Sequence, residues 1–394
     1  MRQIILSTML VAIIAICCSC KGNPKAQSVN VEDCVVIPFE SVIENEHEVL
    51  LSNLAEKVEY IPLQTDSSCL VGNCWENNII RSKKYYFLAD GKNLFQYLLN
   101  GKFIRNIGSV GQGPGEYTWI TDIDVLDESN RIFVSSGEKI NVYDTETGGF
   151  IRALPCSYID CQFRMLNDSI AFRFLYNING QVKHRILITA SQGDTIQAYT
   201  RSDLFTVKED MAFMIGSPND RYIYRSGSNI CYRENYNDTI FTVTKQMLIP
   251  RYIINLGKYH LPLEYRFEVL GDEKKFADMA ANYLAIHPIE TKDYLFISYE
   301  GWNDDKESMG KLVIYDKRNG ECYRVAGGRL KDDMNHFFDF RPMVALDDHT
   351  LLKVFPAEII LKYAKKNPSI FEHESLKSLG EDDNPVLMIV TLKK

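Results

Sequence analysis

The stretch FLADGKNLFQY, residues 87–97, recurs as FVSSGEKINVY at residues 133–143, a constant offset of 46 positions. The glycines and the closing tyrosines of the two copies coincide, and the apolar residues that open one copy meet apolar residues in the other. Shortly afterwards GKFIR at 101–105 is matched by GGFIR at 148–152. Each copy contains a strand, a glycine turn, a second strand and the start of a third, which is typical of an antiparallel meander.

Weaker copies of this unit follow to the end of the chain. The equivalent strands are predicted near residues 87, 133, 171, 223, 296 and 352. Six such units of about 40–70 residues predict an all-β fold, a six-bladed β-propeller of four-stranded antiparallel blades. The 22 tyrosines and 20 phenylalanines agree with half-buried strands. We expect one propeller domain over residues 34–394.

The predicted propeller has to close on itself. Closure removes exposed sheet edges, and it is achieved when the first and last strands share one blade. The last predicted strand, Pro385–Leu392, should therefore lie beside a strand from the N-terminal region. Two segments are candidates, Cys34–Phe39 and Val58–Leu63.

The glycine-rich stretch GSVGQGPGEY, residues 108–117, does not match either common phosphate-binding motif. Glu116 stands where the dinucleotide fingerprint needs its third glycine, and Pro114 stands where a P-loop needs lysine. Both motifs also continue into a helix, whereas WITDIDV at 119–125 alternates like a strand.

We therefore interpret this stretch as a turn between two blades. Gly113 and Gly115 would supply positive φ angles, and the proline between them would stiffen the turn. In the alternative interpretation the loop binds a ligand, and Glu116 and Tyr117 are then candidate binding residues.

The segment GQGPGEY at 111–117 occurs together with VEYIPL at 58–63, NDTIF at 237–241 and DDNPV at 382–386. Taken in their order along the chain, the four segments resemble the six-bladed β-propeller lipoproteins that are abundant in Bacteroides and its relatives and are related in fold to NHL-repeat propellers. The resemblance implies this fold and a location in the cell envelope. It carries over no catalytic residues.

The N-terminal residues predict a signal segment. The apolar run Ile4–Ile16 is shorter than the roughly 20 residues of a membrane-spanning helix and has the length of a secretory h-region. It ends in Cys17-Cys18-Ser19-Cys20, which resembles a lipoprotein signal and predicts cleavage after residue 19 and lipidation of Cys20. Cys18 is the second candidate for lipidation, and an ordinary cleaved signal is the alternative.

Residues 20–33 would then form a tether to the membrane. Surface-exported lipoproteins of these bacteria tend to carry acidic residues just after the lipidated cysteine. Lys21 and Lys25 stand there instead, which favours the periplasmic side of the outer membrane over the cell surface. Contact with the membrane is expected through the lipid anchor only.

The charge composition of the chain limits the classes of partner that it is expected to bind. The formal net charge of −8 and the absence of a long basic run argue against nucleic acid as a partner.

Seven cysteines follow Cys20, so they cannot all pair within one chain. The pairs Cys69/Cys74 and Cys156/Cys161 are interpreted as free thiols, with a disulfide across a turn as the alternative. No CxxC motif indicates a zinc site.

Two helical insertions are expected on one face of the propeller, near residues 263–286 and 357–380. In the first, Phe276, Met279, Ala280 and Tyr283 have the spacing of one helix face and predict a helix near 273–284. The second combines a helix at 357–366 with one that begins at Pro368 and ends before Gly380.

Candidate site residues are few, and no catalytic residue is indicated. Asp122 and Asp124 alternate with Ile123 and Val125 on a predicted innermost strand, where they could point into the central channel and hold a divalent cation such as calcium. Two solvated carboxylates are the alternative. The chain has no GxSxG or HExxH motif, and its seven histidines are scattered.

The sequence thus predicts a lipid-anchored propeller that acts as a non-enzymatic binding or scaffold module for a glycan, peptide or protein partner. The alternative is a metal-dependent hydrolase or lactonase with its site in the central channel. Four or more converging Asp, Glu or Asn side chains in the channel would favour the enzyme.

Overall fold

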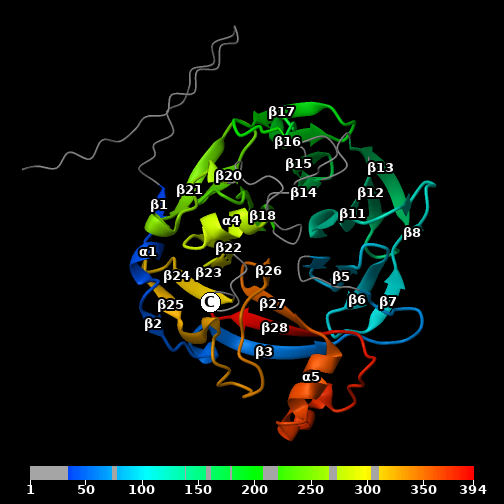
Figure 1. The fold of residues 1–394 in the computed structure, drawn as a ribbon. Helices are drawn as coiled ribbons and strands as arrows, with labels where there is room; N and C mark the ends of the chain where they lie inside the picture. Colours follow the sequence, from blue (N-terminus) through cyan, green and yellow to red (C-terminus); the bar gives the residue numbers. More distant parts are fainter. Residues whose placement is uncertain are drawn as a thin grey trace, which may run out of the picture. The chain divides into compact units, whose positions relative to one another are not determined.

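Six β-sheets of four or five strands follow one another along the chain and surround a common axis in the computed structural model (Figure 1). The structure describes residues 34–72, 78–137, 139–156, 161–177, 180–206, 221–265, 273–302 and 310–394. The predicted signal segment 1–19, Cys20 and the tether 20–33 lie outside the described residues. Among the residues described, no helix is long and apolar enough to cross a membrane.

The first three blades each use four consecutive antiparallel strands. Blade 1 contains β4 (Ile79–Arg81), β5 (Tyr85–Ala89), β6 (Leu94–Leu98) and β7 (Phe103–Asn106). Blade 2 contains β10 (Asp122–Leu126), β11 (Arg131–Ser136), β12 (Lys139–Asp144) and β13 (Phe150–Pro155). Blade 3 contains β14 (Cys161–Asn167), β15 (Ile170–Leu175), β16 (His184–Ala190) and β17 (Thr195–Thr200).

The last three blades also receive strands from the N-terminal residues of the propeller. Blade 4 contains β18 (Ile223–Ser226), β19 (Asn229–Tyr232), β20 (Thr239–Val243) and β21 (Leu248–Ile254), with β1 (Val35–Ile37) outside them. Blade 5 contains β22 (Leu284–Glu290), β23 (Tyr294–Gly301), β24 (Lys311–Asp316) and β25 (Cys322–Val325), with β2 (Glu46–His47) outside them. Blade 6 contains β26 (Val344–Asp347), β27 (Thr350–Phe355), β28 (Val386–Leu392) and β3 (Ala55–Pro62).

This arrangement confirms the predicted six-bladed propeller, with one error of register. Five of the six repeat positions fall in the second strand of a blade, but residue 223 begins β18, the first strand of blade 4. The segment Tyr222–Tyr224, two tyrosines with Ile223 between them, resembles the second strands of other blades in composition. The second strand here is β19, which follows after a two-residue turn at Gly227 and Ser228.

The closure prediction is confirmed for one of its two candidates. β28 pairs antiparallel with β3, with Val386 opposite Pro62 and Val390 opposite Val58. The other candidate segment forms β1, which runs parallel to β21 in blade 4. The N-terminal residues therefore pass along the outside of blades 4 and 5 before they complete blade 6.

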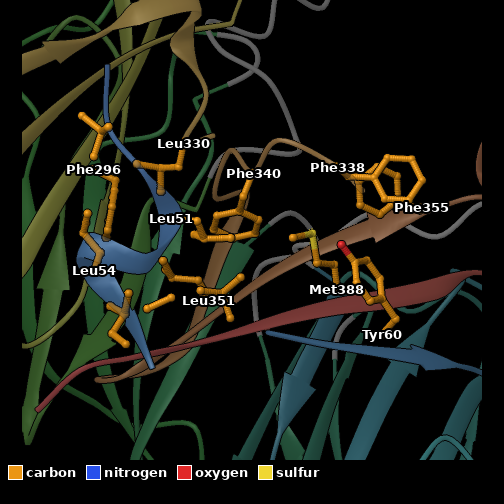
Figure 2. Close-up of a cluster of buried hydrophobic side chains, with 14 of the residues drawn as sticks. Leu51, Leu54, Tyr60, Phe296, Leu330, Phe338, Phe340, Leu351, Phe355 and Met388 are labelled. Atoms are coloured by element: carbon orange, nitrogen blue, oxygen red, sulfur yellow. The ribbon is translucent and has the colours of Figure 1, made fainter. Parts of the chain in front are cut away.

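A large apolar cluster joins blades 5 and 6. Figure 2 shows Leu51, Leu330 and Phe340 lying together, and Phe338 and Phe355 forming a ring pair further along. The segment between the two blades contributes Leu330 and Phe340, which face each other in an isolated antiparallel bridge. This cluster ties the closing blade to its neighbour through burial of apolar area.

Short helices occupy the connections. They are α1 (Phe39–Val42), α2 (Leu51–Leu54), α4 (Glu273–Ala280), α5 (Ala357–Ala364) and the 3-10 turns η3 (Asp127–Ser129), η4 (Gly257–Tyr259), η5 (Ala326–Gly328), η6 (Pro368–Glu372) and η7 (Glu374–Leu376). The helix predicted near 273–284 is shorter than expected, because Leu284 already begins β22. The helix predicted from Pro368 is two 3-10 turns instead.

The two predicted insertions pack on different elements. In α4, Phe276 makes an edge contact with Trp302, just beyond β23. In the second insertion, Ile360, Ile370 and Leu376 are fully buried in the cluster of blade 6. Figure 1 shows α4 beside β18 and β22 and α5 beyond the outermost strand β3.

Candidate functional site

A cavity of about 1120 Å³ lies where the first strands of all six blades converge. Its walls come mainly from β4, β10, β14, β18, β22 and β26, with further residues from neighbouring turns, from β23 and from the segment before β26. First strands of propeller blades surround the central channel, so this cavity is that channel. Ligand pockets for small molecules usually measure about 300–1,000 Å³, and this cavity therefore has room for a ligand of several rings or residues.

Asp122 and Asp124 lie on β10, the strand that faces the channel in blade 2, and both are used to hold blades together. Asp122 accepts hydrogen bonds from the Phe163 N–H (2.8 Å) and from Arg164 Nη1 (2.8 Å). Asp124 accepts hydrogen bonds from the Met165 N–H (2.7 Å) and from Arg225 Nη2 (2.7 Å). Asp124 also lines the cavity. Blades 2, 3 and 4 are joined by these contacts.

The predicted cation does not fit these two carboxylates. Calcium takes six to eight oxygen ligands. Here each carboxylate already faces a guanidinium and a backbone N–H, and these donors repel a cation. Within the described parts of the chain, no group of three or more His, Cys, Asp or Glu side chains could hold a metal ion. The surroundings of these carboxylates suit an anion better.

Among the described residues, six arginines line the cavity, and three of them, Arg164, Arg221 and Arg225, lie near the two carboxylates of β10 and form what we call the arginine wall. Arg164 projects from β14 and is only 5% exposed. Burial opposes its charge, but Asp122 and Asp124 outweigh this effect and raise the pKa of Arg164. Arg221 precedes β18 and donates from Nη2 to the Ile79 carbonyl of blade 1 (3.1 Å). Burial and the neighbouring Arg164 lower the pKa of Arg221 to about 9.

The rest of the lining is mixed in character and includes Arg81, Arg233 and Arg341. Ile80, Ile289, Met343 and Leu346 supply an apolar surface from blades 1, 5 and 6. The turns after β10 and β26 carry acidic side chains, which we call the acidic rim, Asp127, Glu128 and Asp348. The cavity thus offers cationic donors, carboxylate acceptors and an apolar surface to a single ligand.

A further buried polar cluster supports the wall between blades 4 and 5. The Glu290 side chain is fully buried and accepts from Arg251 Nη2 (2.6 Å), Lys317 Nζ (2.7 Å) and the Tyr224 hydroxyl (3.0 Å). Arg251 and Lys317 approach from outer strands and turns, whereas Tyr224 and Glu290 also line the cavity. This cluster holds the shape of the cavity.

The other two predicted binding residues lie in the turn between blades 1 and 2. β8 (Ser109–Val110) and β9 (Glu116–Tyr117) form a short parallel pair there. Glu116 accepts from the Gly113 N–H (2.8 Å), inside its own turn. Tyr117 is buried, and its hydroxyl donates to the Ile107 carbonyl (2.9 Å). The cavity lining includes neither residue.

The prediction for the two glycines of this turn is half right. Gly115 has a φ of 73°, as expected. Gly113 does not have a positive φ, so that prediction is wrong, and its space is limited instead by the Glu116 carboxylate, 3.0 Å from where a Cβ would be. The acidic side chain therefore fixes the turn at Gly113 through the hydrogen bond that it accepts from the Gly113 N–H.

The arginine wall was missed by the sequence analysis, although a signal for it exists. Arg164 lies within QFRML and Arg225 within YIYRS, both short apolar strands. Arginine is almost never buried without a partner, so an arginine inside such a strand indicates an acidic residue or a ligand opposite. Asp122 and Asp124 were identified, but a single sequence did not show that they face arginine.

Residues 34–391 match the family model described as "Domain of unknown function (DUF4934)". A solved structure from Bacteroides fragilis described as a "Putative exported protein" is similar, with 22% identity, coverage of 89% of this chain and 98% of that chain, and a TM-score of 0.69. BamB from Moraxella catarrhalis is 12% identical over 68% of this chain and 66% of its own, with a TM-score of 0.34.

No curated protein matches the sequence. The likeness to the Bacteroides fragilis structure concerns the fold, which six blades and their closure by β3 already show independently. The family model covers nearly all of the described propeller, from the first residue of the unit Cys34–Lys394 almost to its last. The chain belongs to the family described as domain of unknown function DUF4934.

Proposed function

We propose that this protein is a lipid-anchored binding module of the cell envelope, which holds a glycan, peptide or protein partner in the central cavity without chemical conversion. The observation that carries the proposal is the cavity itself, about 1120 Å³ and lined by all six blades. Its walls combine charged, hydrogen-bonding and apolar groups, as ligand pockets do.

Binding without catalysis is favoured over the hydrolase alternative by how the polar residues of the cavity are used. Asp124 and Glu290 are bound to basic side chains and hold blades together. A metal-dependent propeller enzyme needs acidic ligands that converge on its metal, and the described residues contain no group of three or more His, Cys, Asp or Glu side chains that could hold one. The acidic chain, with a net charge of −8, does not favour nucleic acid as the partner.

The location in the envelope is supported by the N-terminal sequence and by the similarity to a protein described as exported. Lipidation of Cys20 would anchor the propeller to a membrane, and Lys21 and Lys25 after it favour the periplasmic side of the outer membrane. The wild-type protein should partition into the detergent phase of a membrane extract, and a Cys20→Ala protein should not. Unchanged partitioning of the variant would contradict lipidation at Cys20.

The cavity is tested by blocking it. Ser228 is exposed, lines the cavity and lies in the turn after β18, so Ser228→Trp fills space at the mouth with little effect on folding. Gln192→Trp is the matched control, because Gln192 is also exposed, lies in the turn after β16 and does not line the cavity. A glycan and peptide array identifies ligands of the wild type. Ser228→Trp should abolish their binding and Gln192→Trp should retain it; equal binding by both would contradict the proposal.

A further inference from the structure

We infer that the ligand of the cavity is an acidic oligosaccharide, and that the arginine wall binds the carboxylate of one of its sugar rings. This inference rests on the proposed function and specifies its ligand. It depends on which donors of the arginine wall face the cavity, on the charges around them, and on the acceptors at the acidic rim.

Arg164 provides the first part of the argument. Its side chain is 5% exposed and lines the cavity. Only Nη1 is used within the described chain, in bonds to Asp122 and to the Phe163 carbonyl. Nε and Nη2 have no described acceptor. A guanidinium presents its donors as a planar fork that matches a carboxylate, so the unused edge of Arg164 is a ready site for one.

The neighbouring charges favour the same occupant. Arg225 lies beside Arg164, since both contact the carboxylates of β10, and its side chain is 34% exposed. The depressed pKa of Arg221 reflects burial near the charge of Arg164. An anion placed between these guanidiniums reduces their mutual repulsion. The positive residues of the wall therefore stabilise a ligand carboxylate rather than compete with it.

The acidic rim then favours a sugar over an acidic peptide. Glu128 is exposed, and among the described residues the side chains of Asp127 and Asp348 accept hydrogen bonds only from the backbone N–H groups of Lys83 and Gly227, respectively. These carboxylates accept hydrogen bonds from hydroxyl groups but repel a second negative charge. A uronic acid ring carries one carboxylate among several hydroxyls, and its C–H groups suit the apolar surface near Met343. The volume accommodates more than one ring.

The test compares charged and neutral forms of the same sugars. Oligosaccharides that contain galacturonate or glucuronate, and their methyl esters, are titrated into the protein calorimetrically. The acids should bind at least tenfold more tightly than the esters, and raising the salt concentration should weaken binding of the acids only. Equal binding of acid and ester, or no binding of any acid, overturns the inference. So does tighter binding of acidic tripeptides, tested as a competing class.

The variants locate the binding. Arg164→Gln combined with Asp122→Asn neutralises the buried pair without leaving one charge alone, and it should weaken binding of the acids at least tenfold. Arg131→Gln combined with Asp144→Asn is the control. These two residues form an ion pair (2.8 Å) within blade 2, the blade that contains Asp122, and neither lines the cavity. Arg164→Lys serves if the double variant does not fold, since it keeps the charge and loses the fork. Unchanged affinity in a folded Arg164 variant overturns the inference.

The two proposals fail in different ways. If a neutral glycan or a peptide binds and Ser228→Trp blocks it, the cavity remains the binding site and only the acidic ligand is wrong. If an acidic sugar binds equally well to Ser228→Trp and to Gln192→Trp, the cavity is not its site and both proposals fail.

Discussion

At the scale of single residues, arginines paired with acidic residues connect neighbouring blades. Arg164 and Asp122 join blades 3 and 2, and Arg251 and Glu290 join blades 4 and 5. Removing one partner of a buried pair typically costs about 3–5 kcal/mol, because it leaves an uncompensated charge. Variants that neutralise both partners are therefore needed to separate folding from binding.

Gly115 is expected to be essential for the turn between blades 1 and 2. Its φ is 73°, and a Cβ there would lie 2.7 Å from the Phe150 ring. Gly115→Ala should lower the free energy of unfolding by at least about 1–2 kcal/mol, from the backbone conformation alone. Gly113→Ala should cost less, because φ is not positive and only the mobile end of Glu116 is close. Thermal melts of the two variants provide the comparison, and equal losses would contradict this account.

His260 should make stability depend on pH. Its Nδ1 lies 2.6 Å from Asp238 Oδ2, and this hydrogen bond raises the pKa of His260 against the opposing effect of burial. A raised pKa means that the pair stabilises the fold below the unfolded value near pH 6.5 and that this contribution is lost as pH rises through the folded pKa.

His260→Gln should therefore lower stability at pH 5.5 and leave it unchanged at pH 8.5. The histidine is 44% exposed, so the loss at low pH should be no more than about 1 kcal/mol. Chemical denaturation at the two pH values measures it. A loss of the same size at both would show that the pair contributes packing rather than charge.

The sequence allowed single residues to be assigned to a strand, but it did not allow their contacts with other blades to be predicted. Asp122 and Asp124 were assigned to an innermost strand because their alternation with apolar residues is local. Their arginine partners are 42 and 101 positions away along the chain, on other blades. Such pairing depends on how blades are arranged around the axis, which no local pattern in one sequence reports.

At the scale of elements, the segment between β25 and β26 inserts apolar side chains between blades 5 and 6. Phe340 is fully buried against blades 5 and 6, and Figure 2 shows its ring next to Leu51. Phe340→Ala should lower the free energy of unfolding by about 3–5 kcal/mol, because the surrounding strands cannot fill the space. Phe371→Ala is the control, since that ring in η6 is 37% exposed and should cost little. A small loss for Phe340→Ala in denaturant titrations would mean that the segment is dispensable.

Element boundaries were predictable where the repeat was strong and failed where it was weak. The copies at 87 and 133 share glycine and tyrosine positions, and both are second strands, β5 and β11. In blade 4, β18 and β19 are four residues each, too short for alternation to distinguish first from second. The predicted helix near 273–284 is longer than the observed helix α4, which ends at Ala280. Tyr283 continues the apolar spacing of the helix, although the strand β22 begins at the next residue.

At the scale of the whole molecule, stability is expected to depend on the ring being closed. β28 lies between β27 and β3, and its residues Val386, Met388 and Val390 are fully buried. A chain that ends at Asn384 leaves β3 without a partner and blade 6 with two strands, so an open sheet edge and a divided core are exposed. This protein should be insoluble or rapidly degraded by protease.

The control removes a strand that adds to a blade without closing the ring. β1 has three residues, and two of them are exposed on the outside of blade 4. A chain that begins at Pro38 should remain soluble and protease-resistant, with a lower melting temperature because Ile37 is lost from the core. If both truncated chains melted at the wild-type temperature, neither strand would matter. If the chain lacking β1 were the less stable one, the ring would be held by the outer N-terminal strands rather than by the antiparallel pairing of β28 with β3.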